Sequence, residues 1–475
     1  MLAGGAWGPS QTEDVIELID PSEGEVFAAI ARGGAGDIDL AVKTAREAFE
    51  KHWESTPAFE RGRYLSRVAG LISDQSDELA SIESQDTGKP LKQSRVDCTV
   101  AARYFEYYAG AADKLHGESI PFLDDFQVFT RREAHGVTAH IIPWNYPLQM
   151  AARTFAATLA AGNAMVIKPA EQACLSVIRL AELLLKADLP ADVINVVTGY
   201  GDEAGASLAQ HKGVDHICFT GSPEVGTLVQ TAAAAENRSC TMELGGKSPQ
   251  IVFADAELDL ALPAIINAII QSAGQTCSAG SRLLVQESLY DKFMPMLAER
   301  FSELQAGAAL MDLDLGPLIS DRQRTRVQDY LDEAESDGVP VIARGLVVDA
   351  APKTGYYLAP VMLGPVPRAN RVASEEIFGP VLSVIPFEDE ADVIRLANST
   401  VYGLTAGIWT KDGGRQMRVA KALKCGQVFI NSYGAGGGVE LPFGGFKRSG
   451  FGREKGMEAL HELTACKTIV HHSGT

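Results

Sequence analysis

The 475-residue sequence has no apolar run approaching the ~18 residues that a membrane-spanning helix needs. Its first twenty residues have neither a basic segment nor a long apolar core, so we expect no secretory signal. Cationic residues are in deficit, because 42 Lys and Arg stand against 61 Asp and Glu and give a net charge of −19. Phosphate would be repelled by such a chain, so we expect neither a nucleic acid nor an anionic membrane surface as a partner.

Cysteine is scarce and scattered. The seven cysteines are odd in number and widely spaced, with no CxxC pair or Cys/His cluster, and a chain of this length needs no disulfide to hold a core. The two histidines of the C-terminal VHHSGT are too few to indicate a metal site. These absences favour reduced cysteines, a cytoplasmic protein and no bound metal.

The composition itself is typical of a globular protein. Apolar residues make up 46% and charged residues 22% of the chain, and its length indicates two to four domains. Apolar residues at helical spacing predict helices over 37–53, 61–84 and 97–115, followed by a strand-like stretch over 127–143. The glycine-rich segment 434–440 is expected to be the most flexible part of the chain, or else a plain surface loop.

Strands and helices then alternate regularly up to about residue 245. Four helices separate five apolar strands, which lie within 137–143, 164–169, 193–199, 214–221 and 239–244. This alternation predicts an α/β fold with a doubly wound parallel sheet, and such sheets bind ligands beyond the carboxyl ends of their strands. A similar alternation follows, so we expect a second α/β domain.

Cys277 lies within SAGQTCSAGSR, in a turn between a predicted helix and a predicted strand. Its small neighbours would admit a substrate, and backbone N–H groups in such a turn can lower the pKa of a thiol and favour the nucleophilic thiolate. The alternative is a buried structural thiol.

Two further polar residues stand next to predicted strands. Glu243 ends an apolar strand just before a Gly-Gly turn, and an apolar cleft would raise its pKa so that it could act as a base near neutral pH. Asn145 follows the first strand, and its amide could donate to a developing oxyanion. The alternatives are an edge-strand Glu that faces solvent and an Asn that caps a helix.

Two strand ends carry residues suited to a dinucleotide. Lys168 and Glu171 could bind ribose hydroxyls, and Glu171 would repel a 2′-phosphate, which favours NAD over NADP. Gly221 and Ser222 lie where a pyrophosphate could meet a helix N-terminus, although the segment is not GxGxxG. Taken alone, these residues could equally be ordinary loop residues.

Seven segments in order resemble the aldehyde dehydrogenase superfamily over nearly the whole chain, namely IIPWNYPL, KPAEQ, FTGSPEVG, MELGGKSP, GQTCSAGSR, EEIFGPV and LPFGGFKRSGFGRE. The resemblance implies that Cys277 is the nucleophile, Glu243 the general base and Asn145 the oxyanion-hole donor. It implies NAD as the cofactor and a cofactor site made by Ile141, Trp144, Lys168, Glu171, Gly221, Ser222, Leu244, Glu376 and Phe378.

The resemblance also implies a domain organisation. An NAD-binding domain would comprise 1–115 and 135–245, and a catalytic domain 246–448. An oligomerisation element would comprise 116–134 and 449–475, which predicts a homodimer or a homotetramer.

The implied reaction oxidises an aldehyde to a carboxylic acid through a thiohemiacetal and a thioester on Cys277, with water activated by Glu243 for hydrolysis. Acyl transfer to coenzyme A is a rival, but acylating members of the superfamily generally lack the Glu of ELGG. A non-catalytic binding protein is a third hypothesis, and it need not keep Cys277, Glu243 and Asn145 together.

One departure concerns the substrate. Many members carry Lys nine positions after the Asn of PWN, where this chain has Thr154. Its neighbour Arg153, with Gln271 and Phe443, would face the substrate tunnel, and in succinate-semialdehyde dehydrogenases an arginine there pairs with the substrate carboxylate. A carboxylated aldehyde is therefore one hypothesis. Alternatively, Arg153 pairs with a protein carboxylate, fills the tunnel or points to water, and the substrate is aromatic or of medium chain length.

Overall fold

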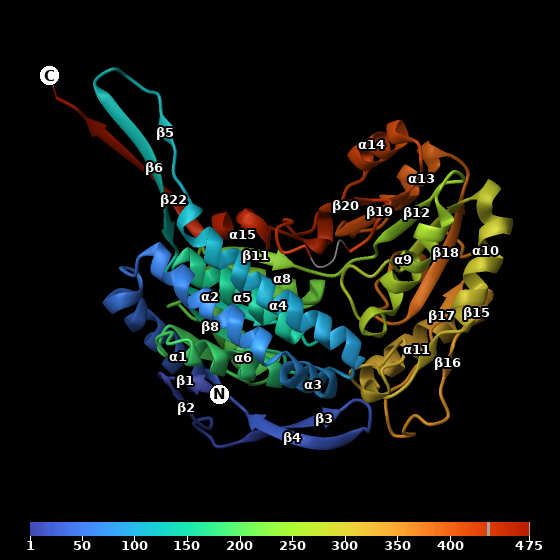
Figure 1. Cartoon of the computed structure of the whole chain (residues 1–475), viewed down its shortest axis with the longest axis horizontal. Coiled ribbons are helices and arrows are strands. Elements are labelled where there is room, and N and C mark those ends of the chain that lie inside the picture. The colour runs from blue at the N-terminus through green and yellow to red at the C-terminus, as the bar shows by residue number, and fades with distance from the viewer. Residues whose placement is uncertain (435–437, 475) are drawn as a thin grey trace.

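The computed structural model of the chain describes residues 1–434 and 438–474. They form two α/β bodies side by side, with a narrow sheet that projects from one of them (Figure 1). The predicted α/β class is confirmed. The segment predicted to be flexible, 434–440, lies partly outside the described residues, at 435–437.

The first body is built around an eight-stranded sheet. In spatial order its strands are β2 (Ala6–Trp7), β1 (Leu2–Ala3), β9 (Ile194–Val196), β8 (Ala164–Pro169), β7 (Val137–Ile142), β10 (His216–Thr220), β11 (Ser239–Glu243) and β21 (Gly450–Phe451). The five strands from β9 to β11 in this order are parallel and are the five that the sequence predicts. They have an almost continuous apolar sequence because helices bury both faces of the sheet.

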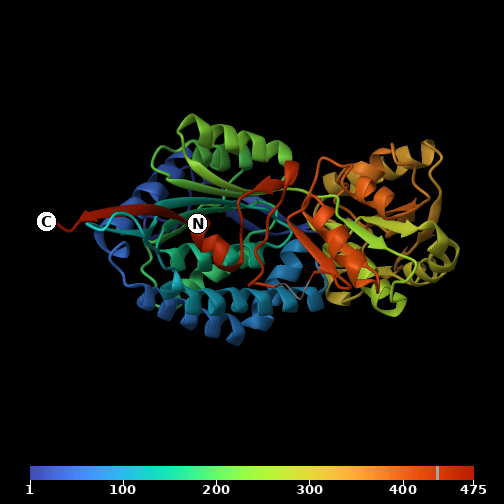
Figure 2. The same cartoon turned by 90° about the horizontal axis from the view of Figure 1, so that it is seen from above.

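Helices lie on both faces of this sheet (Figure 2). They are α1 (Ala35–Ala48), α2 (Ala58–Asp74), α3 (Ser76–Thr87), α4 (Leu91–Ala111), α5 (Pro147–Ala161), α6 (Leu175–Lys186), α7 (Ala206–Gln210), α8 (Pro223–Ala235) and α15 (Gly456–Glu462). Every residue of α5 except Gln149 is buried, and the small residues of this helix let it pack between α4 and the sheet. As predicted, α5 starts with Pro147 and ends at Gly162, whose φ of +94° suits glycine.

The second body has a seven-stranded sheet and its own apolar core. Its strands, in spatial order, are β15 (Val341–Arg344), β17 (Val361–Leu363), β18 (Val381–Phe387), β13 (Arg282–Gln286), β12 (Pro249–Val252), β19 (Thr405–Trp409) and β20 (Gln427–Ile430). The helices around it are α9 (Leu258–Ile270), α10 (Glu287–Ser302), α11 (Asp321–Ser336), α12 (Arg371–Ser374), α13 (Glu390–Ala397) and α14 (Gly413–Ala422). Single turns of 3-10 or π-helix in the chain are η1 (Phe49–Trp53), η2 (Ala112–Lys114), η3 (Gly201–Gly205), η4 (Gln271–Gly274), η5 (Ala309–Met311) and η7 (Lys447–Ser449).

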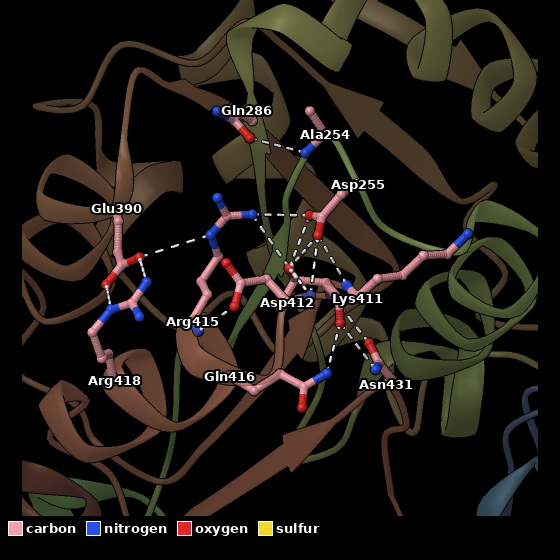
Figure 3. A network of polar contacts seen from close by, with 11 residues as sticks. Ala254, Asp255, Gln286, Glu390, Lys411, Asp412, Arg415, Gln416, Arg418 and Asn431 are labelled. Carbon is pink, nitrogen blue, oxygen red and sulfur yellow. Dashed lines mark hydrogen bonds and ion pairs between the residues drawn. The ribbon is translucent and has the colours of Figure 1, made fainter.

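A polar network fastens the loops beyond the carboxyl ends of β12 and β19 (Figure 3). The Asp255 carboxylate accepts hydrogen bonds from Thr410 Oγ1 at 2.8 and 2.9 Å, from the backbone N–H groups of Lys411 and Asp412, each at 3.1 Å, and from Arg415 Nη1 at 2.9 Å. One carboxylate thus joins two neighbouring strands to the start of α14.

The projecting sheet has three strands, β22 (Thr464–His472), β6 (Phe126–Ala134) and β5 (Ser119–Ile120). The strand pair and the C-terminal tail, expected to form one element, do pair here along the whole of β22. The rest of the predicted element 449–475 lies elsewhere, because β21 pairs with β11 and Leu460 of α15 is buried in the core of the first body.

Strands at the N-terminus were not expected. They are β1, β2 and the pair β3 (Val15–Asp20) and β4 (Glu25–Ala31), which forms a separate two-stranded sheet. A second two-stranded sheet, later in the chain, consists of β14 (Gln305–Ala306) and β16 (Leu346–Val347). Within the described part of the chain, no helix is both long and apolar enough to cross a bilayer.

Candidate active site

The predicted catalytic residues come from both bodies. Asn145 follows β7 and Glu243 ends β11, so both stand at the carboxyl edge of the first sheet, whereas Cys277 precedes β13 of the second. The two bodies meet at this point: a Cβ atom on Gly246 would lie only 2.5 Å from the Cys277 carbonyl oxygen. The chain just after Glu243 therefore packs against the backbone of Cys277, and only glycine permits that approach.

The loop that carries Cys277 begins with a tight left-handed turn. After α9 the chain passes through η4, where Ser272 and Ala273 have φ values of +48° and +52° and Gly274 has +76°. A Cβ atom on Gly274 would lie 2.2 Å from the carbonyl oxygen of Gly379. The turn is thus wedged against the chain before β18, and it directs the following residues toward the first body.

Asn145 is buried and holds this loop. Its Nδ2 donates to the carbonyl oxygen of Gln275 at 2.8 Å, while its Oδ1 has no hydrogen-bond partner among the described groups. An amide nitrogen carries two hydrogens, so one remains for another acceptor next to Cys277.

Glu243 is 2% exposed, and neither of its carboxylate oxygens has a hydrogen-bond partner among the described groups. Burial raises the pKa of Glu243 well above its usual range, and the nearby charge of Glu454 raises it further. The raised pKa agrees with the expectation for a carboxyl in an apolar cleft. Such a group can take a proton near neutral pH, and its unused oxygens are suited to bind a water molecule.

The pKa of Cys277 is governed by its burial, which acts against the lowering that backbone N–H groups could provide. Burial raises the pKa of this half-buried thiol to about 12, with the charges of Glu376 and Glu243 acting in the same direction, while Arg153 and Lys455 oppose them. Desolvation of a thiolate outweighs the nearby cations. Cys277 is therefore a thiol at rest and needs a base, or a nearby positive charge, to become a nucleophile.

The adenosine end of a dinucleotide would meet two predicted groups. Lys168 Nζ lies 3.1 Å from Glu171 Oε2 at the end of β8, so the cation and the carboxylate already face one another. Ser222, which is exposed, caps α8 by accepting from the Val225 N–H at 3.3 Å, and Gly221 N–H donates to the Glu243 carbonyl at 3.0 Å. The N-terminus of α8 is thus open to a phosphate.

The residues predicted to hold the nicotinamide end of the cofactor lie close to one another. Glu376 accepts from the Gly246 N–H at 2.9 Å, and burial raises its pKa to about 7. A Cβ atom on Gly245 would lie 2.1 Å from this carboxylate. The ring of Trp144 meets that of Phe378 edge-on with centroids 5.5 Å apart, and Phe378 has a φ of +63°.

Two other predicted cofactor residues belong to the same edge of the first sheet. Ile141 is half-buried in β7, and the side chain of Leu244 lies against Gly226 of α8, where a Cβ atom would come within 2.6 Å of it. The charged side chains and the open helix N-terminus at this edge are groups of the kind that bind a dinucleotide.

The predicted substrate residues do not act as one group. Arg153 is buried, its guanidinium pairs with the carboxylate of Glu454, and its Nη2 lies 3.4 Å from Thr220 Oγ1. The protein-partner alternative is therefore the one that the structure contains, and the idea of an Arg153 waiting for a substrate carboxylate has to be corrected. Gln271 is exposed. Phe443 is buried, and its backbone exchanges two hydrogen bonds with the backbone of Glu454.

The sequence motifs indicate no role for Glu454. Glu454 ends the motif LPFGGFKRSGFGRE, yet its link to Arg153 joins residues about 300 positions apart and leaves no local signal. Lys247 in the ELGGK segment was also missed: it is buried, and burial together with the charge of Arg282 lowers its pKa to about 7. Among the described residues, no group of three or more His, Cys, Asp and Glu side chains is placed to hold a metal ion.

Comparison with known proteins points to one family. A family model described as "Aldehyde dehydrogenase family" matches residues 7–469. An aldehyde dehydrogenase of Emericella nidulans is 41% identical over 461 residues, which are 97% of this chain and 92% of that protein. A Burkholderia cenocepacia protein provisionally assigned as an aldehyde dehydrogenase has a crystal structure with a TM-score of 0.99 at 56% identity, covering 100% and 99% of the two chains. A betaine aldehyde dehydrogenase from Staphylococcus aureus, solved in complex with NAD+, gives a TM-score of 0.96 at 37% identity and covers 100% and 95%.

Proposed function

Because the chain belongs to the aldehyde dehydrogenase family, we propose that it oxidises an aldehyde to a carboxylic acid with NAD, through covalent catalysis at Cys277. The observation that carries this proposal is that residues of the first body pack around the Cys277 loop of the second body. Asn145 is hydrogen-bonded to the Cys277 loop, Gly246 packs on the Cys277 carbonyl, and Glu243 is buried with both oxygens unused.

The first half of the reaction forms a bond between Cys277 Sγ and the aldehyde carbon. The thiol releases its proton to solvent water as the bond forms, and the carbonyl oxygen becomes an oxyanion. The second amide hydrogen of Asn145 and the Cys277 backbone N–H donate to that oxyanion. NAD, when bound, would supply the acceptor for the hydride on the same carbon, and Cys277 would then hold the acyl group as a thioester.

The second half releases the acid. Glu243 accepts a proton from water, the water oxygen bonds to the thioester carbon, and the bond from that carbon to Sγ breaks. A raised pKa suits Glu243 to this step, because a carboxylate of ordinary pKa would be a weak base near neutral pH. Acyl transfer to coenzyme A would have no need of such a base.

The cofactor is proposed to be NAD rather than NADP. Glu171 lies beside Lys168 where the adenosine ribose would lie, and a 2′-phosphate would meet the Glu171 charge and lose its hydroxyl hydrogen bonds. NAD is also the cofactor in the complex of the Staphylococcus aureus relative.

We further propose a cytoplasmic homo-oligomer, as a dimer or a tetramer. The scattered cysteines support the compartment, because they favour a reduced state. The projecting β22-β6-β5 sheet supports the assembly. Within the described chain, the outer edges of β22 and β5 pair with no further strand, and such edges can pair with another subunit.

The deciding experiment follows NADH formation from an aldehyde without coenzyme A, in the wild type and in Cys277→Ser, with NAD and with NADP. We expect turnover in the wild type, higher kcat/KM with NAD, and a loss of at least about 10³-fold in Cys277→Ser with NAD binding retained, because an alcohol is a far weaker nucleophile. Wild-type turnover in Cys277→Ser would refute the mechanism, and equal use of both cofactors would refute the role of Glu171.

A further inference from the structure

A buried ion cluster lies behind the loop of Cys277. The Lys89 ammonium group lies 3.1 Å from Glu83 Oε1 and also pairs with Asp97, and all three side chains are buried. Because one cation faces two carboxylates in a dry environment, each member depends on the others for its stability. We call these residues the Lys89 cluster.

The Lys89 cluster fixes the start of α5. Glu83 Oε2 accepts from Ser176 Oγ at 2.6 Å and from the Leu148 N–H at 3.3 Å, and Asp97 Oδ1 accepts from Gln149 Nε2 at 2.6 Å. Four helices, α3, α4, α5 and α6, are joined through these bonds. A carboxylate at the first turn of α5 is also favoured by the helix dipole.

Tyr146 connects the cluster to the loop. The Lys89 ammonium lies 4.1 Å from the centre of the Tyr146 ring, a cation–π contact in a buried site. The Tyr146 hydroxyl is 2.9 Å from Thr276 Oγ1, and Thr276 directly precedes Cys277. The ring thus has one face on the ion cluster and its hydroxyl on the neighbour of the nucleophile.

Other hydrogen bonds hold the residues on either side of this contact. Asn145 reaches Gln275, and Gln93 Oε1 of α4 accepts from the Ser272 N–H at 2.9 Å. On the far side, the Tyr433 hydroxyl donates to the carbonyl oxygen of Ser278 at 2.5 Å. The Tyr146–Thr276 bond is the tether that the first body places directly before Cys277.

We propose that Tyr146 is a positioning residue, seated on the Lys89 cluster, which fixes Thr276 and so sets the direction in which Cys277 Sγ faces the site. This proposal rests on the proposed function, since it concerns the same nucleophile. It assigns to Tyr146 no contact with the reacting atoms. The Tyr146 ring is held in place because it packs on Lys89, and Lys89 cannot move without leaving a buried charge unpaired.

The test measures alkylation of Cys277 by iodoacetamide, followed at each cysteine by peptide mass spectrometry, together with kcat/KM. Tyr146→Phe should lower both quantities by about 3- to 10-fold, the effect of one hydrogen bond. Thr276→Val should lower them at least as much, because it also removes the hydrogen bond from Thr276 Oγ1 to the Gln271 carbonyl oxygen at 3.3 Å. The double variant should lose no more than Thr276→Val alone, because that change already removes the Tyr146–Thr276 bond. Tyr146→Leu, which also removes the ring from Lys89, should lose more than Tyr146→Phe.

Three controls separate positioning from general damage. The alkylation of exposed Cys466 should not change, NAD binding should be retained, and Tyr290→Phe on α10 should behave as wild type. Losses that multiply in the double variant, unchanged alkylation of Cys277, or equal behaviour of Tyr146→Phe and Tyr146→Leu would overturn the proposal. Alkylation needs no aldehyde turnover, so a failure of the proposed function would appear in Cys277→Ser instead.

Discussion

Within the part of the chain that the structure describes, the Glu243 carboxyl group has no hydrogen-bond partner, which makes its role testable. Glu243→Gln removes the proton acceptor and keeps the shape, so hydride transfer should proceed once and hydrolysis should stop. We expect a burst of about one NADH per active site in stopped-flow measurements, followed by a steady rate lowered by at least about 10²-fold. Loss of the burst itself, with NAD still bound, would show that Glu243 serves an earlier step.

Arg153 shows how a partner decides the function of a charge. Its guanidinium is already bound to Glu454, so it has little to offer a substrate carboxylate. We expect Arg153→Ala to lower kcat/KM for butanal and for succinic semialdehyde by similar factors, and to lower stability by about 3–5 kcal/mol because Glu454 is left buried without its cation. A loss of kcat/KM confined to succinic semialdehyde would contradict this expectation and support the hypothesis that Arg153 binds a substrate carboxylate.

At the scale of elements, the Asp255 carboxylate joins the loops after β12 and β19 to α14 (Figure 3). Asp255→Asn leaves one oxygen to serve donors that two oxygens now serve, and it removes the charge that faces Arg415. Since the side chain is 37% exposed, solvent offsets part of the loss. We expect a melting temperature about 2–4 °C lower, with kcat unchanged. Asp349→Asn, at an exposed loop position, is the matched control and should melt as wild type does.

The parallel strands of the first sheet and their helices could be predicted from the sequence, because burial on both faces leaves long apolar runs separated by helical spacing. Strands β1 and β21 could not, since each has two residues and exists through a distant partner: Leu2 pairs with Val196, and Gly450 with Glu243. The same distinction applies to the candidate site. The sequence motifs predict the candidate catalytic residues. The contact between Tyr146 and Lys89 depends instead on the packing of residues that are far apart in the sequence, and no local pattern indicates it.

At the scale of the whole molecule, the projecting sheet stands away from both bodies (Figure 1). Ile120, Phe129 and Val470 on it are 39%, 40% and 56% exposed, which is a large apolar area for a sheet with so little core. If it joins subunits, Phe129→Asp with Val470→Asp should lower the mass measured by analytical ultracentrifugation to that of a smaller assembly. An unchanged mass, or a wild type that sediments as a single chain, would contradict the predicted oligomer.

The pairing of β21 with β11 has a consequence for synthesis of the chain. Glu243 emerges from the ribosome well before Gly450, its neighbour in the sheet, and Arg153 well before Glu454. The first body therefore keeps one sheet edge open and one buried cation unpaired until Gly450 and Glu454 have been translated. A chain interrupted before these residues would hold the thiol of Cys277 without the strand that completes the sheet beside Glu243.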